Sequence, residues 1–235
     1  MTNVQWGQPS LAARGTLPDS VGIPRYVTTG HDLSPGLWHP AEKDTALLIV
    51  PGMGEPRSGI NYLWSELADR GHKAGFGSLR LELSGCGNDS GPVSFDLWRL
   101  QVSSAISWLK SRCLRLVVIA RGAGALAVPQ EADCELLSLR PPTVLGLRDL
   151  LDATSGRRFS PWETVGSGHA GAVSDLGIEA RCCGGLNFPR SVLTDLLTGL
   201  TSAKVPSTTW LSTAQTHLTL RERAWVTDHV MEWLQ

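Results

Sequence analysis

The sequence predicts a single α/β domain with a mostly parallel, twisted sheet and helices on both faces. The short continuous apolar run at 45–50 is typical of a buried strand, further strands are expected over 78–83 and 114–120, and segments of helical period separate them. Crossovers of that length return the chain parallel to the preceding strand. A length of 235 residues suits one domain with a substantial core. We expect this domain over 41–235, after an irregular lead-in over 1–40 that contributes one or two edge strands.

The first elements follow from local pattern. The run Thr45–Val50 is a buried strand that ends at the turn 51–54. A helical pattern covers Asn61–Arg70, and Gly71 is expected at its C′ position. A second strand over 78–83 leads into the glycine-rich loop 84–92.

The remaining elements alternate in the same way. Apolar residues recur at helical spacing from Asp96 to Arg112, and the strand 114–120 is followed by a helix from about Ala123. Further along we expect strands over 143–147, 177–183 and 208–212 and helices over 191–200 and 220–234, with a loop-rich stretch over 152–175.

Composition excludes several classes of protein. With 21 basic and 22 acidic residues the net charge is −1, and no Lys/Arg run suggests a nucleic-acid partner. No apolar stretch is long enough for a membrane span, and the first residues lack the pattern of a secretory signal. The five cysteines fit no zinc spacing. We therefore expect a reduced cytoplasmic protein with no metal and no cofactor.

The most informative segment is the turn after the strand 114–120. Ala120 and Gly124 occupy the small-residue positions of a nucleophile elbow, the sharp strand-to-helix turn that exposes a serine hydroxyl. Gly122 then stands at the nucleophile position, which is therefore vacant. The pattern indicates the frame of a catalytic site without its reacting atom.

Four segments follow one another in the chain: Val50–Gly54 after a buried strand, the loop Gly85–Gly91, the elbow, and Thr216-His217 after the last strand. Together they resemble the α/β-hydrolase superfamily, over about residues 40–235. The Gly-Cys-Gly loop, Ser155–Phe159 and Gly184–Phe188 look most like small exosortase-associated or S33-peptidase-like hydrolases within it. The resemblance implies the α/β-hydrolase fold.

The resemblance also implies roles at the site. The backbone N–H groups of Met53 and Ala123 would form the oxyanion hole, and His217 would be the base. His217 is also compatible with an ordinary surface histidine.

The carboxylate that would orient His217 is harder to assign. The usual position is empty because segment 204–216 contains no carboxylate. Asp152 is the preferred substitute, with Asp149 and Asp195 as further candidates, and each is also compatible with a solvated loop or cap carboxylate.

Two residues near the elbow have alternative interpretations. Cys86 lies in a loop that the fold brings near the site, where a thiolate would be a competent nucleophile. Arg121 would bind a substrate carboxylate or phosphate, or else cap a helix or lie on the surface. The run 122–127 also spells the Gly-x-Gly-x-x-Ala dinucleotide fingerprint, with Asp149 after it, although that motif normally opens the first βαβ unit.

Two functions follow from these residues. The first is an enzyme that processes a small-molecule acyl substrate at its carbonyl without a covalent intermediate, by cyclisation, hydrolysis or a related step. The second is an inactive pseudo-hydrolase that binds a ligand or a partner protein.

Overall fold

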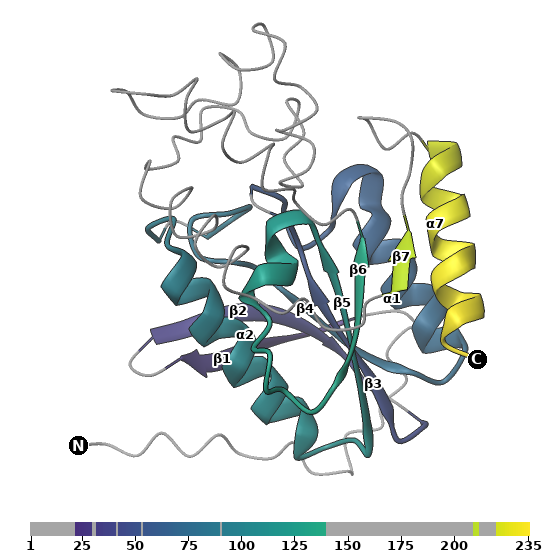
Figure 1. Cartoon of the computed structure of the whole chain (residues 1–235), viewed down its shortest axis with the longest axis horizontal. Coiled ribbons are helices and arrows are strands. Elements are labelled where there is room, and N and C mark those ends of the chain that lie inside the picture. Colours follow the sequence, from purple (N-terminus) through teal and green to yellow (C-terminus); the bar gives the residue numbers. More distant parts are fainter. Residues whose placement is uncertain are drawn as a thin grey trace, which may run out of the picture.

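The computed structural model describes residues 22–29, 32–40, 42–52, 54–89, 91–139, 209–211 and 220–235. These residues form a 7-stranded sheet in the order β1-β2-β4-β3-β5-β6-β7, with helices on both faces (Figure 1). The fold class expected from the sequence is confirmed. The strands are β1 (Ile23–Thr29), β2 (Asp32–His39), β3 (Thr45–Val50), β4 (Gly77–Leu81), β5 (Arg115–Arg121), β6 (Glu135–Leu139) and β7 (Thr209–Leu211). The helices are α1 (Leu63–Lys73), α2 (Phe95–Lys110) and α7 (Leu220–Trp233), with short 3₁₀ turns η1 (Ile60–Tyr62) and η2 (Gly122–Ala127).

The strand directions bring the loops of interest to one edge of the sheet. Strands β1 and β2 form an antiparallel hairpin that pairs antiparallel with β4, whereas β4, β3, β5, β6 and β7 are parallel. Val50 lies opposite Ala120, so β3 and β5 end side by side. The loop after β3 and the turn after β5 therefore meet at the carboxyl edge, where ligands bind in open α/β sheets.

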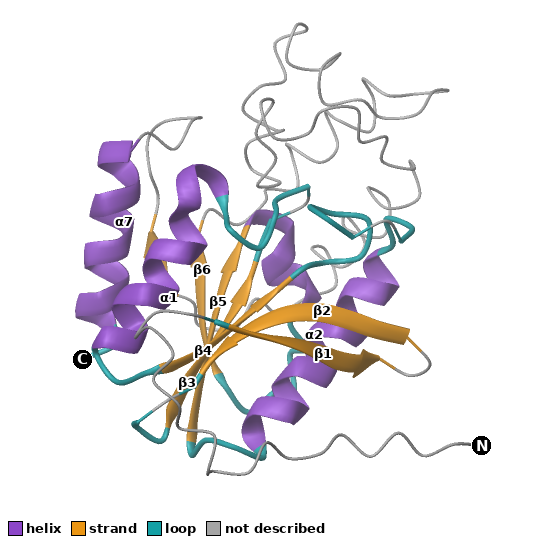
Figure 2. Ribbon diagram, turned by 180° about the vertical axis from the view of Figure 1, so that it is seen from behind, coloured by secondary structure: helices purple, strands orange, loops and turns teal. Residues whose placement is uncertain are grey.

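Alternation along the strands builds two cores. Leu48 and Val118 face the layer of α2, whereas Leu47 and Ile119 face the layer of α1 and α7. Figure 2 shows α2 on one side of the sheet and α1 and α7 on the other. Full burial on both faces explains why these strands read as continuous apolar runs.

Two local expectations are wrong, each for a physical reason. Gly71 lies inside α1, where a side chain would press on Leu47, and the helix ends instead before Gly75, whose φ is 87°. The turn after β5 is a short 3₁₀ turn because Pro129 follows closely and opposes a longer helix. The next strand is β6, ahead of the expected strand 143–147, which lies outside the described residues.

Other expectations are confirmed, with small shifts at their ends. Strand β7 falls within 208–212, α7 falls within 220–234, and the hairpin β1–β2 supplies the edge strands of the N-terminal segment. The expected elements over 177–183 and 191–200 lie outside the described residues.

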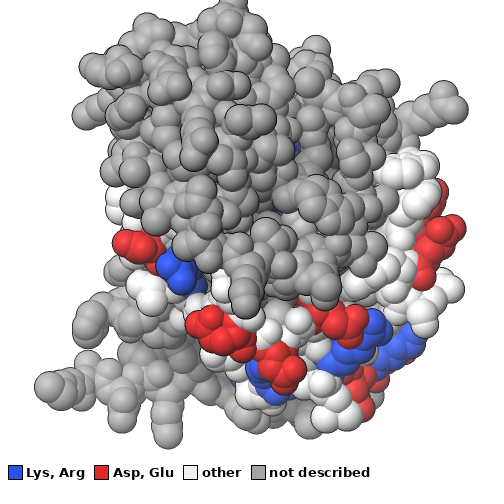
Figure 3. Space-filling model, in the orientation of Figure 1, with Lys and Arg blue, Asp and Glu red and all other residues white. Residues whose placement is uncertain are grey.

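Two surface properties of the described residues complete the fold. In the part of the surface that Figure 3 colours, basic and acidic side chains are interspersed. Among the described residues, Arg115 pairs with Glu135 and Lys110 with Asp133. None of the described helices combines the length and apolar character that a membrane crossing requires.

Candidate functional site at the elbow after β5

The turn after β5, where the sequence predicts the nucleophile elbow, is sharp and contains one left-handed residue. Arg121 is extended (φ −118°, ψ 139°), and Gly122 then adopts φ 52°, in the left-handed region. For a residue with a side chain this conformation costs about 1–2 kcal/mol. Glycine adopts it freely, so the sharp turn forms here without strain.

Close packing requires glycine at position 124, the second small position of the predicted elbow. A Cβ atom placed there would overlap the carbonyl oxygen of Pro51, the first residue after β3. The elbow therefore packs directly on the backbone of the loop after β3. Ala123, between the two glycines, is completely buried.

Glu55, in the loop after β3, is 0% exposed, and its carboxylate accepts hydrogen bonds from three groups. Its Oε1 accepts from Arg121 Nη1 at 3.0 Å. Its Oε2 accepts from the backbone N–H of Gly52 at 2.7 Å and from Trp64 Nε1 at 3.3 Å. A single carboxylate thus joins the loop, helix α1 and the elbow.

Arg121 is correspondingly buried, with a side chain that is 4% exposed. Its charge is balanced by Glu55 in a region of low dielectric, where an unpaired charge would be very costly. This pairing weighs against the interpretation of Arg121 as a fixed cation for a substrate anion.

Cys86 lies on the other side of the same loop. Its Sγ accepts from the backbone N–H of Gly54 at 3.3 Å. Burial raises the pKa of this thiol to about 12; the Gly54 N–H opposes the shift and the nearby carboxylates add to it. A thiol held protonated in this way is a poor nucleophile at neutral pH.

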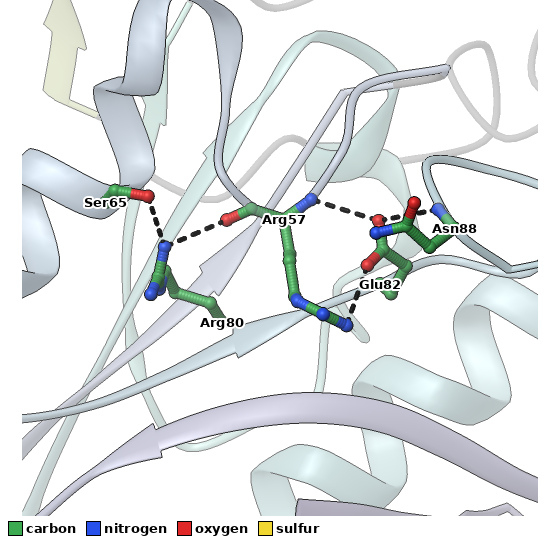
Figure 4. Close-up of polar contacts among 5 residues, drawn as sticks. All are labelled: Arg57, Ser65, Arg80, Glu82 and Asn88. Atoms are coloured by element: carbon green, nitrogen blue, oxygen red, sulfur yellow. Dashed lines mark hydrogen bonds and ion pairs between the residues drawn. The ribbon is translucent and has the colours of Figure 1, made fainter. Parts of the chain in front are cut away.

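A second charged cluster contacts the far end of the loop after β3 (Figure 4). Glu82, just beyond β4, is fully buried. Its Oε2 forms an ion pair with Arg57 Nη1 at 2.9 Å, and its Oε1 accepts from the backbone N–H of Arg57 at 3.2 Å. It also accepts from the backbone N–H of Asn88 at 3.3 Å. Arg80 donates to the Arg57 carbonyl oxygen at 3.5 Å and to Ser65 Oγ. The buried Glu82 carboxylate therefore joins the loops after β3 and β4.

Arg80 also perturbs a histidine behind this cluster. Burial, with the Arg80 charge second, lowers the pKa of His39 to about 4. His39 Nε2 lies 3.4 Å from Arg80 Nη2, so the neutral ring accepts a hydrogen bond that the protonated ring would lose.

The structure brings together part of the set expected from the sequence. Arg121, Gly122, Ala123 and Cys86 all lie around the loop after β3. The remaining candidates lie outside the described residues: Met53, Asp149, Asp152, Asp195 and His217.

Sequence reasoning missed Glu55, Arg57, Arg80 and Glu82. The sequence offers only a weak signal for Glu55, an acidic residue in the turn that follows the buried strand 45–50. The dinucleotide interpretation is not supported, because run 122–127 forms a 3₁₀ turn after the fifth strand. That motif requires a long helix after the first strand, with its N-terminus toward the pyrophosphate.

Sequence comparison finds neither a matching protein-family model nor a similar curated protein. Structural comparison finds α/β hydrolases. Est1E from Butyrivibrio proteoclasticus, with ferulic acid bound, has a TM-score of 0.65 at 11% identity, covering 89% of this chain and 97% of that chain. Monoglyceride lipase from Saccharomyces cerevisiae has a TM-score of 0.61 at 11% identity, covering 94% and 97%. A putative hydrolase from Agrobacterium vitis has a TM-score of 0.60 at 12% identity, covering 91% and 98%.

Proposed function

Because the chain has the α/β-hydrolase fold with glycine at the elbow, we propose that it is an enzyme acting at the carbonyl of an acyl substrate without a covalent intermediate. In this proposal the backbone N–H groups of Met53 and Ala123 bind the carbonyl oxygen. His217 is the general base, and Asp152 orients it. The reaction class is hydrolysis, cyclisation or another acyl-processing step.

The main support is the elbow itself. Gly122 keeps a left-handed φ of 52°, and Gly124 keeps the backbone contact with Pro51. An oxyanion hole is made of backbone donors, so the loss of a serine hydroxyl does not remove it. Each such donor contributes about 10²–10³ in rate for acyl chemistry.

We assign proton transfer to His217 because two other candidate groups, Cys86 and Arg121, are unsuited to it. The Cys86 thiol is buried and has a pKa raised to about 12, and Arg121 is paired with Glu55. Proton transfer therefore needs another group, and a histidine titrates in the required range. With Gly122 at the elbow, a water or a second nucleophilic group of the substrate takes the place of the serine hydroxyl.

A direct test restores the missing atom. In the variant Gly122→Ser, a hydroxyl beside a base and an oxyanion hole reacts with a fluorophosphonate and hydrolyses p-nitrophenyl acetate. We expect no labelling of the wild type and labelling of Gly122→Ser, lost again in Gly122→Ser/His217→Ala. The variant Gly122→Ala is the control for backbone strain and stays unlabelled.

Two outcomes would contradict the proposal. A folded Gly122→Ser variant that stays unlabelled refutes a working base and oxyanion hole. A labelled serine in the wild type refutes the interpretation of Gly122 as the nucleophile position. The wild-type reaction is tested by incubation with ester, thioester and lactone panels and mass spectrometry, in which His217→Ala abolishes turnover.

A second candidate function is a pseudo-hydrolase that binds a ligand or partner protein. It is favoured by the neutralisation of Glu55 and Arg121 by each other and by the protonated state of Cys86. A folded Gly122→Ser variant that is unlabelled supports this second function over the first.

A further inference from the structure

We propose that Glu55 is a positioning residue whose carboxylate holds the loop after β3 against the elbow. The inference rests on the proposed function, since in that proposal the loop after β3 and the turn after β5 carry the two donors of the oxyanion hole. Glu55 itself touches no substrate in this proposal. It acts through Gly52 and Arg121.

The contacts of the carboxylate make it a bridge between two segments. Oε2 holds the N–H of Gly52, at the start of the loop, and Oε1 holds Arg121, the residue before Gly122. These partners come from the ends of neighbouring parallel strands, β3 and β5. A shift of the loop relative to the elbow must therefore break one of these hydrogen bonds.

The residues on either side of Met53 are both held by side chains. Gly52 donates to Glu55, and Gly54 donates to the buried thiol of Cys86. Glycine backbone is otherwise the most mobile kind. These hydrogen bonds hold the N–H groups of Gly52 and Gly54, and a backbone that presents an oxyanion donor must be fixed in this way.

The ring of Trp64 fixes the carboxylate in turn. Trp64 is fully buried in helix α1, and its Nε1 donates to the same oxygen that holds Gly52. The loop is therefore tied to the core of the domain as well as to the elbow. An apolar side chain at position 55 would fill the same volume but would direct no N–H group.

The experiment uses the variant Glu55→Met, which keeps volume and removes every acceptor. Glu55→Met/Arg121→Met removes both charges of the pair, so that it folds even where the single change destabilises the protein by burying the Arg121 charge without the Glu55 carboxylate. Each is made in the wild type and in Gly122→Ser. Two readouts are taken: the maximal fluorophosphonate labelling rate of the Gly122→Ser proteins, and amide hydrogen exchange at Gly52 in the wild-type background by NMR.

A matched control separates positioning from general loss of stability. Trp64 and Trp98 are both fully buried tryptophans whose indole N–H donates, to Glu55 and to the carbonyl oxygen of Ser84 respectively. Trp98→Phe loses stability but leaves the labelling rate and the Gly52 exchange within about twofold of the parent. Trp64→Phe raises Gly52 exchange and slows labelling.

For Glu55→Met/Arg121→Met we expect labelling slowed by about tenfold or more with inhibitor affinity little changed, because a misplaced donor acts on the transition state. We expect exchange at Gly52 to rise by about tenfold or more, because its amide loses a buried acceptor. Unchanged exchange, or faster exchange with unchanged labelling, overturns the inference. If the Gly122→Ser parent is not labelled, the proposed function fails, and exchange at Gly52 alone decides whether Glu55 holds the loop.

Discussion

The buried ion pair between Glu55 and Arg121 makes a quantitative prediction about stability. Both side chains are almost completely buried, at 0% and 4% exposed. Breaking such a pair by removing one partner costs about 3–5 kcal/mol, because the other charge stays behind without compensation. Removing both charges avoids that penalty.

The magnitudes follow from the contacts. Arg121→Met leaves the carboxylate with the N–H groups of Gly52 and Trp64, so we place its cost at the lower end, about 3 kcal/mol. Glu55→Gln has one acceptor oxygen where the carboxylate uses two, so its amide N–H₂ must face a donor, which costs a similar amount. In the double variant Glu55→Gln/Arg121→Met, the glutamine oxygen accepts from the Gly52 N–H while the glutamine N–H₂ faces the methionine side chain. We expect it to cost at least about 2 kcal/mol less than the sum of the single changes.

The assay is a double-mutant cycle by urea unfolding at pH 7, followed by far-UV circular dichroism. For a domain of this size each single change lowers the Tm by about 6–12 °C. Addition of 0.5 M NaCl leaves the coupling unchanged, since buried pairs are screened little. Additivity to within about 0.5 kcal/mol would refute the interpretation of this contact as a desolvated ion pair.

Three further predictions concern single residues. Gly124→Ala forces a Cβ into the Pro51 carbonyl and lowers the free energy of unfolding in urea by about 2–3 kcal/mol. In the control Gly71→Ala the new Cβ meets only a side chain, and the loss stays within about 1 kcal/mol. Equal losses in the two variants would contradict the contact between Gly124 and Pro51. Cys86, with its pKa raised to about 12, resists iodoacetamide at pH 8 in the folded protein and reacts in urea, and rapid native alkylation by peptide mass spectrometry would oppose this. His39 has its pKa lowered to about 4 by burial, so as pH falls from about 6.5 the unfolded state binds the proton first and stability is lost progressively down to about pH 4, by up to about 3 kcal/mol. His39→Gln removes this part of the pH dependence, and an unchanged slope of unfolding free energy from pH 7 to 4.5 would count against it.

The fold was predictable where burial leaves a clear local pattern. Strands β3 and β5 pack on both faces, and their continuous apolar runs follow from that. Strand β6 was missed because it begins at an exposed Glu135 and contains Ser138, so its burial comes from pairing with β5 rather than from composition. The prediction that Gly71 ends α1 was wrong because glycine commonly follows the last turn of a helix, whereas here it lies inside α1 and allows the helix to approach Leu47.

The candidate site was predictable only where it depends on backbone shape. The small residues around Gly122 encode the elbow locally, because a left-handed φ and a close backbone approach select glycine. The link from Glu55 to Arg121 spans 66 positions in the sequence. Nothing local marks it, since it exists only once β3 and β5 are paired. Charged side chains that meet through topology are therefore the part of this site that requires the fold.

The choice of charge at this contact bears on function. Apolar side chains of the same volume often stabilise a protein as well as a buried ion pair does. What the pair adds is direction: the Glu55 oxygens fix where the Gly52 N–H and the Arg121 guanidinium point. Direction matters little for packing and much for backbone donors that must meet one oxygen atom. In the proposed reaction such donors hold a carbonyl in place while another group attacks it. Binding alone places weaker demands on the direction of each donor, so the contacts of Glu55 favour the proposed enzyme over the pseudo-hydrolase.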